Sequence, residues 1–228
     1  MSTAPRPRLF LAILLAQLLV SLDSTIVNIA LPRMQAGLSL TDDARQWVIT
    51  SFALVFGVAL LFGGRLVDLL GSVRTLYGGL ALIGLASLGG ALSDNAEEIL
   101  AARIGQGLAA AVIAPATISL IPLLFTDVKA RARAFGLFNA VMGAGAGVGL
   151  LVGGLLAEYA GWQWCLAINI PLAATAAAVL VTSRRSATLP AAATPRTGPA
   201  DWLSLLVMGA GFGLLVYALD RTAVRDWD

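Results

Sequence analysis

The chain has 228 residues, of which 58% are hydrophobic and only 12% are charged, and its formal net charge is +2. Soluble domains carry about 25% charged residues, so this composition indicates an integral membrane protein. The chain has no histidine and one cysteine, Cys165, which excludes His/Cys metal clusters, a His-based catalytic triad and an intramolecular disulfide. The apolar stretches also hold no paired carboxylates, so we expect neither enzyme activity nor a metal or other cofactor.

Seven apolar stretches are long enough to cross a bilayer as helices. They are Leu9–Pro32, Trp47–Leu66, Leu76–Leu92, Leu100–Leu124, Phe135–Tyr159, Trp164–Thr182 and Trp202–Leu219. This pattern predicts an all-α integral membrane protein. The first stretch is too long for the hydrophobic region of a signal peptide and lacks a convincing cleavage site, so we expect it to be retained.

Basic residues concentrate on one side of this topology. With the N-terminus inside, the inner segments hold Arg6, Arg8, Arg65, Arg74, Lys129, Arg131, Arg133, Arg184, Arg185 and Arg196. The outer loops hold Arg33 and Arg45, beside Asp42, Asp43, Asp94, Glu97 and Glu98. Because cytoplasmic loops carry the excess of basic residues, this asymmetry predicts a cytoplasmic N-terminus. The basic clusters are short and tied to helix ends, so we expect no nucleic-acid partner.

The first stretch contains a carboxylate, Asp23, nine residues before the Pro32 at which we expect the helix to end. An ionised Asp inside a membrane helix costs about 2.5 to 3.5 kcal/mol on insertion scales, so it usually faces a bundle interior, a partner or a water-filled path. The alternative is that Asp23 caps the helix or reaches the interface. The residues that follow it before Pro32 argue against that alternative.

The segment from Gly64 to Arg74 predicts a short inner loop between the second and third helices. Glycines near its two ends, Gly64 and Gly71, allow the chain to reverse direction. Asp68 can accept hydrogen bonds from the backbone or from an arginine. A generic cytoplasmic turn explains the same residues.

The fourth stretch contains a second charged residue, Arg103. At 1.5 Å per residue, Asp23 and Arg103 both come out about 6 to 9 Å below the outer face. Their matching depth predicts an ion pair between the first and fourth helices, which Gln106 on the next turn would extend. Protonation of Asp23 would release Arg103 and act as a switch, whereas a purely structural ion pair is the alternative.

Small residues in the fifth stretch predict a smooth helical face. Gly145, Gly149 and Gly153 recur at every fourth position, and Gly154 lies beside them. Such faces let helices approach closely in a membrane. Plain helix packing and bending or rocking at this face are both open interpretations.

Residues 183–201 are polar and contain Pro190, Pro195 and Pro199, as is typical of a linker. We therefore expect a six-helix transmembrane bundle at residues 1–182, a cytoplasmic linker at 183–201, and a seventh transmembrane helix with a short tail at 202–228.

In this order, the elements resemble the major facilitator superfamily, and specifically its fourteen-helix drug/proton antiporter branch. The matching residues are Leu22–Pro32, Gly64, Asp68, Gly71, Arg103, Gln106, Gly107, Gly149, Gly153, Gly154, Gly161–Trp164, Ile168–Pro171 and Asp201–Trp202. The resemblance covers nearly the whole chain. It implies the N-terminal six-helix bundle of that fold plus one additional transmembrane helix.

The resemblance also implies a function: proton-coupled efflux of small molecules or multiple drugs by alternating access, in the inner membrane of a bacterial cell. It assigns proton coupling to Asp23 and Arg103. The gating loop would comprise Gly64, Asp68, Gly71 and Arg74. The substrate cavity would be lined by Thr25, Asn28, Gln106 and Gln17. The packing of the fifth helix would use Gly145, Gly149, Gly153 and Gly154. The implied partners are the lipid bilayer, protons, and a hydrophobic or cationic organic substrate.

Members of this family enclose their cavity between two six-helix halves. The first six stretches supply one such half, and the seventh is an additional helix. Three alternatives stay open. The chain is a half-subunit that needs a separate C-terminal half, it assembles as a homo-oligomer, or it is a non-transporting truncated fragment.

Overall fold

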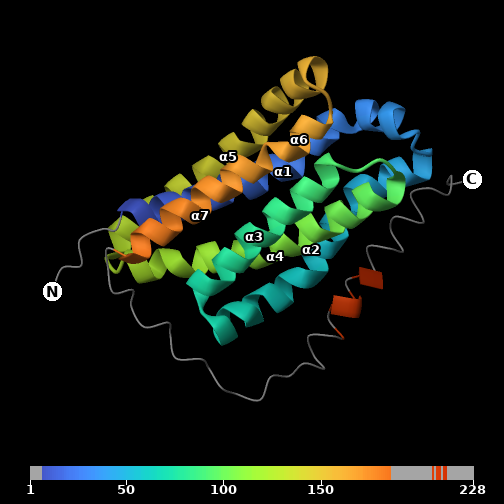
Figure 1. Cartoon of the computed structure of the whole chain (residues 1–228). Helices are drawn as coiled ribbons and strands as arrows, with labels where there is room; N and C mark the ends of the chain where they lie inside the picture. Colours follow the sequence, from blue (N-terminus) through green and yellow to red (C-terminus); the bar gives the residue numbers. More distant parts are fainter. Residues whose placement is uncertain (1–6, 186–206, 208, 212, 215–228) are drawn as a thin grey trace, which may run out of the picture.

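The computed structural model describes residues 7–185, together with Val207, Gly209–Gly211, Gly213 and Leu214. Within residues 7–185 the chain forms α1 (Pro7–Leu38), α2 (Asp42–Leu70), α3 (Ser72–Ala91), α4 (Ala96–Leu124), α5 (Val128–Tyr159), α6 (Gln163–Ala167) and α7 (Asn169–Arg185). Among the described residues, six helical spans are long and apolar enough to cross a membrane, with α6 and α7 together making the sixth. The helices lie alongside one another in one bundle, and α7 ends at the same end of it at which α1 begins (Figure 1).

Helix α1 continues through Pro32 to Leu38, so the prediction that it ends at Pro32 is wrong. A proline removes only the hydrogen bond that its missing N–H would donate, here to the carbonyl of Asn28, and membrane helices tolerate this loss. Asp23 consequently lies near the middle of the 32 residues of α1.

The predicted loop between the second and third helices is also shorter than expected. Residues from Gly64 to Leu70 form the last turns of α2, and Gly71 alone separates α2 from α3. Gly71 has φ 81° and ψ 147°, a backbone conformation that favours glycine. Its carbonyl accepts a hydrogen bond of 2.9 Å from the hydroxyl of Thr75, which fixes the turn. The apolar residues before Gly71 contain no helix breaker, so α2 continues up to it.

The sixth predicted stretch is divided into α6 and α7, which lie end to end (Figure 1). Pro171 lacks the N–H that would bond the carbonyl of Ala167, and the division falls at this missing hydrogen bond. Helix α7 continues to Arg185, past the boundary predicted at residue 182. Most of the predicted linker lies outside the described residues. So does most of the stretch Trp202–Leu219, of which the six described residues are helical.

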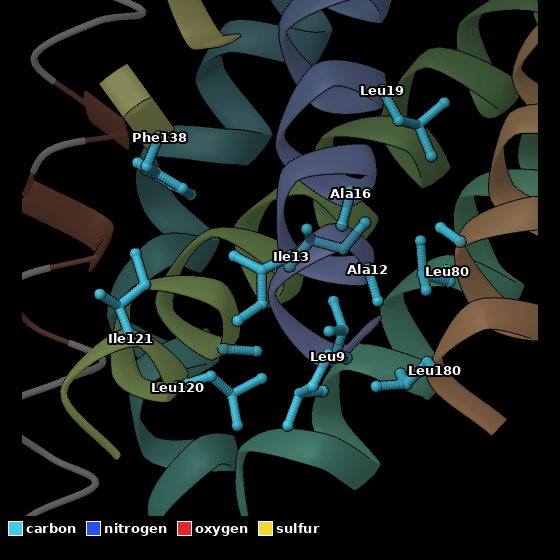
Figure 2. Packing of buried hydrophobic residues seen from close by; sticks show 14 of the residues in the cluster. Leu9, Ala12, Ile13, Ala16, Leu19, Leu80, Leu120, Ile121, Phe138 and Leu180 are labelled. Atoms are coloured by element: carbon cyan, nitrogen blue, oxygen red, sulfur yellow. The ribbon is translucent and has the colours of Figure 1, made fainter. Parts of the chain in front are cut away.

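Two apolar clusters fill the bundle, one towards each end. The first is built around Leu9, Ile13, Leu80, Leu120 and Leu180, all at most 3% exposed. Figure 2 shows these side chains of α1, α3, α4 and α7 converging. The second cluster lies towards the other end and gathers residues from α1, α2, α4 and α6 and the turn before α6: Leu22, Ile26, Met34, Val48, Ile99, Trp162 and Leu166 are among its members.

Candidate functional site

Five buried polar side chains lie between the two apolar clusters, and we call them the polar layer. They are Asp23 on α1, Ser87 on α3, Arg103 and Gln106 on α4, and Asn169 on α7. None is more than 2% exposed. Helices α1, α3 and α4 pack against both apolar clusters, whereas α7 begins at the polar layer and continues into the first cluster. Four transmembrane spans are therefore joined at one level of the bundle by polar contacts.

The centre of the polar layer is an ion pair. Nη1 of Arg103 lies 3.4 Å from Oδ2 of Asp23, as their matching depth predicted. Arg103 is also attached to α2, because its Nε donates to the carbonyl of Val48 at 3.1 Å. Its guanidinium carbon lies 4.3 Å from the centroid of the Phe52 ring, which is a cation–π contact. Arg103 thus contacts α1 and α2 at the same time.

Two side-chain amides complete the hydrogen bonding of Asp23. Gln106 Nε2 donates to Asp23 Oδ1 at 3.0 Å and to Ser87 Oγ at 2.9 Å. Gln106 Oε1 accepts from Arg103 Nη1 at 2.8 Å. Asn169 Nδ2 donates to the same Asp23 Oδ1 at 2.5 Å and to Ser87 Oγ at 3.2 Å. The carboxylate therefore accepts hydrogen bonds from three side chains on two other helices.

This arrangement can bind and release a proton at Asp23. A buried charge pair is favourable only when its geometry and remaining hydrogen bonds are satisfied, and here donors from Arg103, Gln106 and Asn169 supply them. Adding a proton to Asp23 removes one of the two charges and weakens the pair. Arg103 would then keep its contacts with Gln106, the Val48 carbonyl and the Phe52 ring.

Of the four predicted cavity residues, only Asn28 is exposed. Gln106 is fully buried in the polar layer, and Gln17 is 7% exposed. The amide of Gln106 is bonded to Asp23, Ser87 and Arg103, and its assignment to the cavity lining stays a prediction. Thr25 lies between α1 and α5, where its hydroxyl is 3.2 Å from the carbonyl of Ala146.

Three of the four predicted packing glycines bring α5 against α1. A Cβ on Gly149 would overlap Oγ1 of Thr25 and lie 3.0 Å from the carbonyl oxygen of Leu22. A Cβ on Gly153 would lie 2.8 Å from Cγ1 of Ile26, and one on Gly145 would lie 3.0 Å from Cβ of Ser21, which is a tight contact. Gly154 differs, because its Cβ would meet Ile29 at 3.8 Å, an ordinary contact distance.

The residues predicted to form a gating loop do not form one. Asp68 lies within α2 and is 3.8 Å from Nη1 of Arg65 on the preceding turn. Arg74 is exposed on the first turn of α3. A Cβ on Gly64 would meet nothing within 4 Å. The role in gating stays a prediction for Gly71 and its flanking helix ends.

Sequence reasoning missed Ser87, Asn169 and Phe52 as members of the site or its surroundings. The sequence could have identified Asn169, because it is a polar residue two positions before Pro171 in an otherwise apolar stretch. Ser87 has none, because an isolated serine is common in membrane helices. Phe52 is one of many apolar residues in α2, and its place beside Arg103 depends on the packing of α2 against α4.

In the described part of the chain, six apolar helical spans around a buried Asp–Arg pair define a multi-pass membrane protein. Residues 13–224 match the family model described as Major Facilitator Superfamily, so the chain belongs to this superfamily.

Its similar proteins include antibiotic resistance and export proteins. The puromycin resistance protein pur8 of Streptomyces alboniger is 50% identical over 172 residues, which are 74% of this chain and 34% of that protein. The cephamycin export protein CmcT of Amycolatopsis lactamdurans is 36% identical over 93% of this chain and 43% of its own length. The lincomycin resistance protein of Streptomyces lincolnensis is 35% identical over 93% of this chain and 42% of its own length. The chain thus spans less than half the length of these relatives.

A solved structure supports the fold. The crystal structure of a mutant of the peptide transporter POT in complex with sulfate superposes with a TM-score of 0.73, covering 98% of this chain and 47% of that one. At 17% sequence identity, this likeness concerns the fold alone.

Proposed function

We propose that this chain is the N-terminal half of a proton-coupled transporter that exports small organic compounds by alternating access. The observation that carries the proposal is the buried pair of Asp23 and Arg103, 3.4 Å apart and enclosed by two amides within the bundle. An ionisable residue at such a position is a functional-site hypothesis by default, because burying it is costly.

In the proposed mechanism the proton changes which helices are tied together. With Asp23 ionised, its attraction to Arg103 joins α1 to α4. With Asp23 protonated that attraction is lost, while Arg103 remains attached to α2 through the carbonyl of Val48 and the ring of Phe52. Protonation therefore loosens α1 without leaving Arg103 unpartnered. A ligand or proton shifts a conformational equilibrium only through such a difference between two states.

Hydrophobic or cationic organic molecules are the proposed substrates. The puromycin, cephamycin and lincomycin proteins are named for resistance to, or export of, antibiotics, which supports a small organic substrate for this chain. Asn28 is an exposed polar residue on α1, about 7.5 Å along the helix from Asp23 at 1.5 Å per residue. We assign it to the substrate-facing surface.

We also propose that the N-terminus lies in the cytoplasm. The end of the bundle at which α1 begins carries Arg8, Arg74, Lys129, Arg131 and Arg133 within the first two turns of α1, α3 and α5. The first turns of α2 and α4, at the other end, carry Asp42, Asp43, Glu97 and Glu98. This distribution agrees with the excess of basic residues on cytoplasmic loops.

A second half is required to complete the proposed cavity. The bundle matches 47% of the chain of the structurally similar peptide transporter, which supports a missing half of comparable size. A separate C-terminal half or a second copy of this chain would supply it. A fragment without transport activity is the competing candidate, favoured by the short match to the curated relatives.

A chimera tests the proposal. This chain would replace the matching segment of the puromycin resistance protein, and efflux of labelled puromycin would be measured from a sensitive host with and without a protonophore. We expect protonophore-sensitive efflux that Asp23→Asn abolishes and that Glu97→Gln, at an exposed acid on α4, preserves. The unfused chain would be tested in parallel, since its activity would identify a homo-oligomer. Undiminished efflux by the Asp23→Asn chimera would refute the coupling role.

A further inference from the structure

The amide of Asn169 has an unused acceptor. Its Nδ2 donates to Asp23 and Ser87, whereas its Oδ1 is buried and has no hydrogen-bond partner. It is the sole orphaned side-chain oxygen of the polar layer. Buried amide oxygens are nearly always hydrogen-bonded, so an orphan beside a titratable carboxyl calls for an explanation.

The orientation of this amide depends on the protonation state of Asp23. A carboxylate only accepts hydrogen bonds, so the Nδ2 of Asn169 must face it. A protonated carboxyl has one O–H to donate, and the Oδ1 of Asn169 would face it after the amide turns over. Ser87 fits both orientations, because a hydroxyl can accept from Nδ2 or donate to Oδ1.

We propose that Asn169 is a positioning residue that holds Asp23 in both protonation states by rotating its amide. It donates to the carboxylate, and after rotation about Cβ–Cγ its Oδ1 accepts the proton of the acid. The resting orphan is the acceptor kept for the protonated state. The rotation turns the side-chain amide about one bond and leaves the backbone of α7 in place. This inference rests on the proposed function in one respect, that Asp23 is the group that binds the proton.

None of the other described groups around Asp23 can accept a hydrogen bond from its protonated form as Asn169 can. In the described part of the chain, α4 presents the charged Arg103, and α6 presents the thiol of Cys165 in the neighbouring apolar cluster. At the level of the polar layer α2 presents Phe52 and the Val48 carbonyl, α3 presents Ser87, and α5 presents Gly145 and Gly149. Gln106 has its oxygen committed to Arg103. Asn169 alone combines contact with Asp23 and a free acceptor.

Infrared difference spectroscopy on the full 228-residue chain in lipid nanodiscs tests the rotation. The chain would carry Asn28→Ser, Asn95→Ser and Asn139→Ser, so that Asn169 is the sole asparagine and the five residues of the polar layer are unaltered. These three residues are exposed, and serine can replace Asn95 as the N-cap of α4. Spectra of ¹³C-asparagine-labelled and unlabelled chain would be compared between alkaline and acidic buffer.

We expect a carboxylic-acid band that Asp23→Asn removes, and with it a shift of the Asn169 carbonyl band to lower wavenumber. The free carbonyl gains a hydrogen bond, which weakens its C=O bond. Asn169→Ser should delete the shifting band while the Asp23 acid band remains. Only asparagine carries the ¹³C label, so the bands of Cys165 and Arg103 do not change between the labelled and unlabelled chains.

Two results would overturn the inference. One is an Asp23 acid band with an unmoved Asn169 carbonyl, which would leave proton binding at Asp23 intact but assign Asn169 a fixed donor role. The other is the absence of any Asp23 acid band across the pH range, which would mean that Asp23 does not bind the proton to which the rotation responds. A moving Asn169 band in a chain whose chimera shows no proton-coupled export would sustain the inference and refute the proposed function alone.

Discussion

At the scale of single residues, the position of Arg103 decides how the buried charges are tolerated. Its guanidinium contacts Asp23, Gln106, the Val48 carbonyl and the Phe52 ring, so it has partners whether or not Asp23 is charged. Asp23, by contrast, has Arg103 as its one cationic partner in the described part of the chain. The pair is therefore asymmetric, and removing either partner should have a different consequence.

We predict that Arg103→Ala destabilises the chain by about 3 to 5 kcal/mol, because it leaves the carboxylate of Asp23 buried without its counter-charge. The double variant Asp23→Asn with Arg103→Ala should be more stable than Arg103→Ala alone, since no uncompensated charge then remains. Unfolding midpoints in detergent would compare the variants.

The matched control is Glu158→Gln, at an ion pair with Arg33 whose side chains are 58% and 48% exposed. Exposed pairs contribute about 0 to 1 kcal/mol, so this change should be nearly silent. Equal losses for Arg103→Ala and Glu158→Gln would contradict the central place given to the buried pair.

At the scale of helices, the approach of α5 to α1 depends on the absence of side chains at three positions of α5. Gly145, Gly149 and Gly153 lie against the segment of α1 that carries Asp23. Gly143 and Gly147, on the other side of the same helix, have no neighbouring atom within 4 Å of a Cβ. One helix therefore carries both a packed and an unpacked glycine face.

Gly149→Ala should push α5 away from Thr25 and the Leu22 carbonyl, costing about 1 to 3 kcal/mol as overpacking does. Gly147→Ala, which adds the same methyl group two residues earlier, should be neutral or slightly stabilising because alanine favours helix. Thermal unfolding of both variants provides the comparison. Indistinguishable midpoints would mean that the α1–α5 contact is not close-packed.

The sequence was sufficient to predict the six spans, the pairing of Asp23 with Arg103 and the close packing at Gly149. Those predictions rest on hydrophobic length, on the cost of burying charge and on residue size, which are local properties. The helix ends at Pro32 and Gly64 were misjudged because a membrane helix continues past a proline or glycine that neighbouring helices accommodate. Ser87 and Phe52 were missed because their roles arise from where α3 and α2 pack against α4.

At the scale of the whole molecule, a polar layer between two apolar clusters gives the bundle one level at which its helices are tied by polar contacts. The clusters above and below consist of apolar side chains, whose contacts with one another are insensitive to a proton. A change at Asp23 therefore acts on α1, α3, α4 and α7 together. We propose that this layer provides the proton coupling.

The most direct test separates coupling from transport in proteoliposomes that contain the puromycin-protein chimera. Counterflow exchange of labelled substrate needs no net proton movement, whereas accumulation driven by a pH gradient does. We predict that Asp23→Asn retains exchange and loses accumulation, because the half still assembles and moves but no longer carries the proton. Accumulation by Asp23→Asn at the level of the unmodified chimera would contradict the assignment of proton coupling to the polar layer.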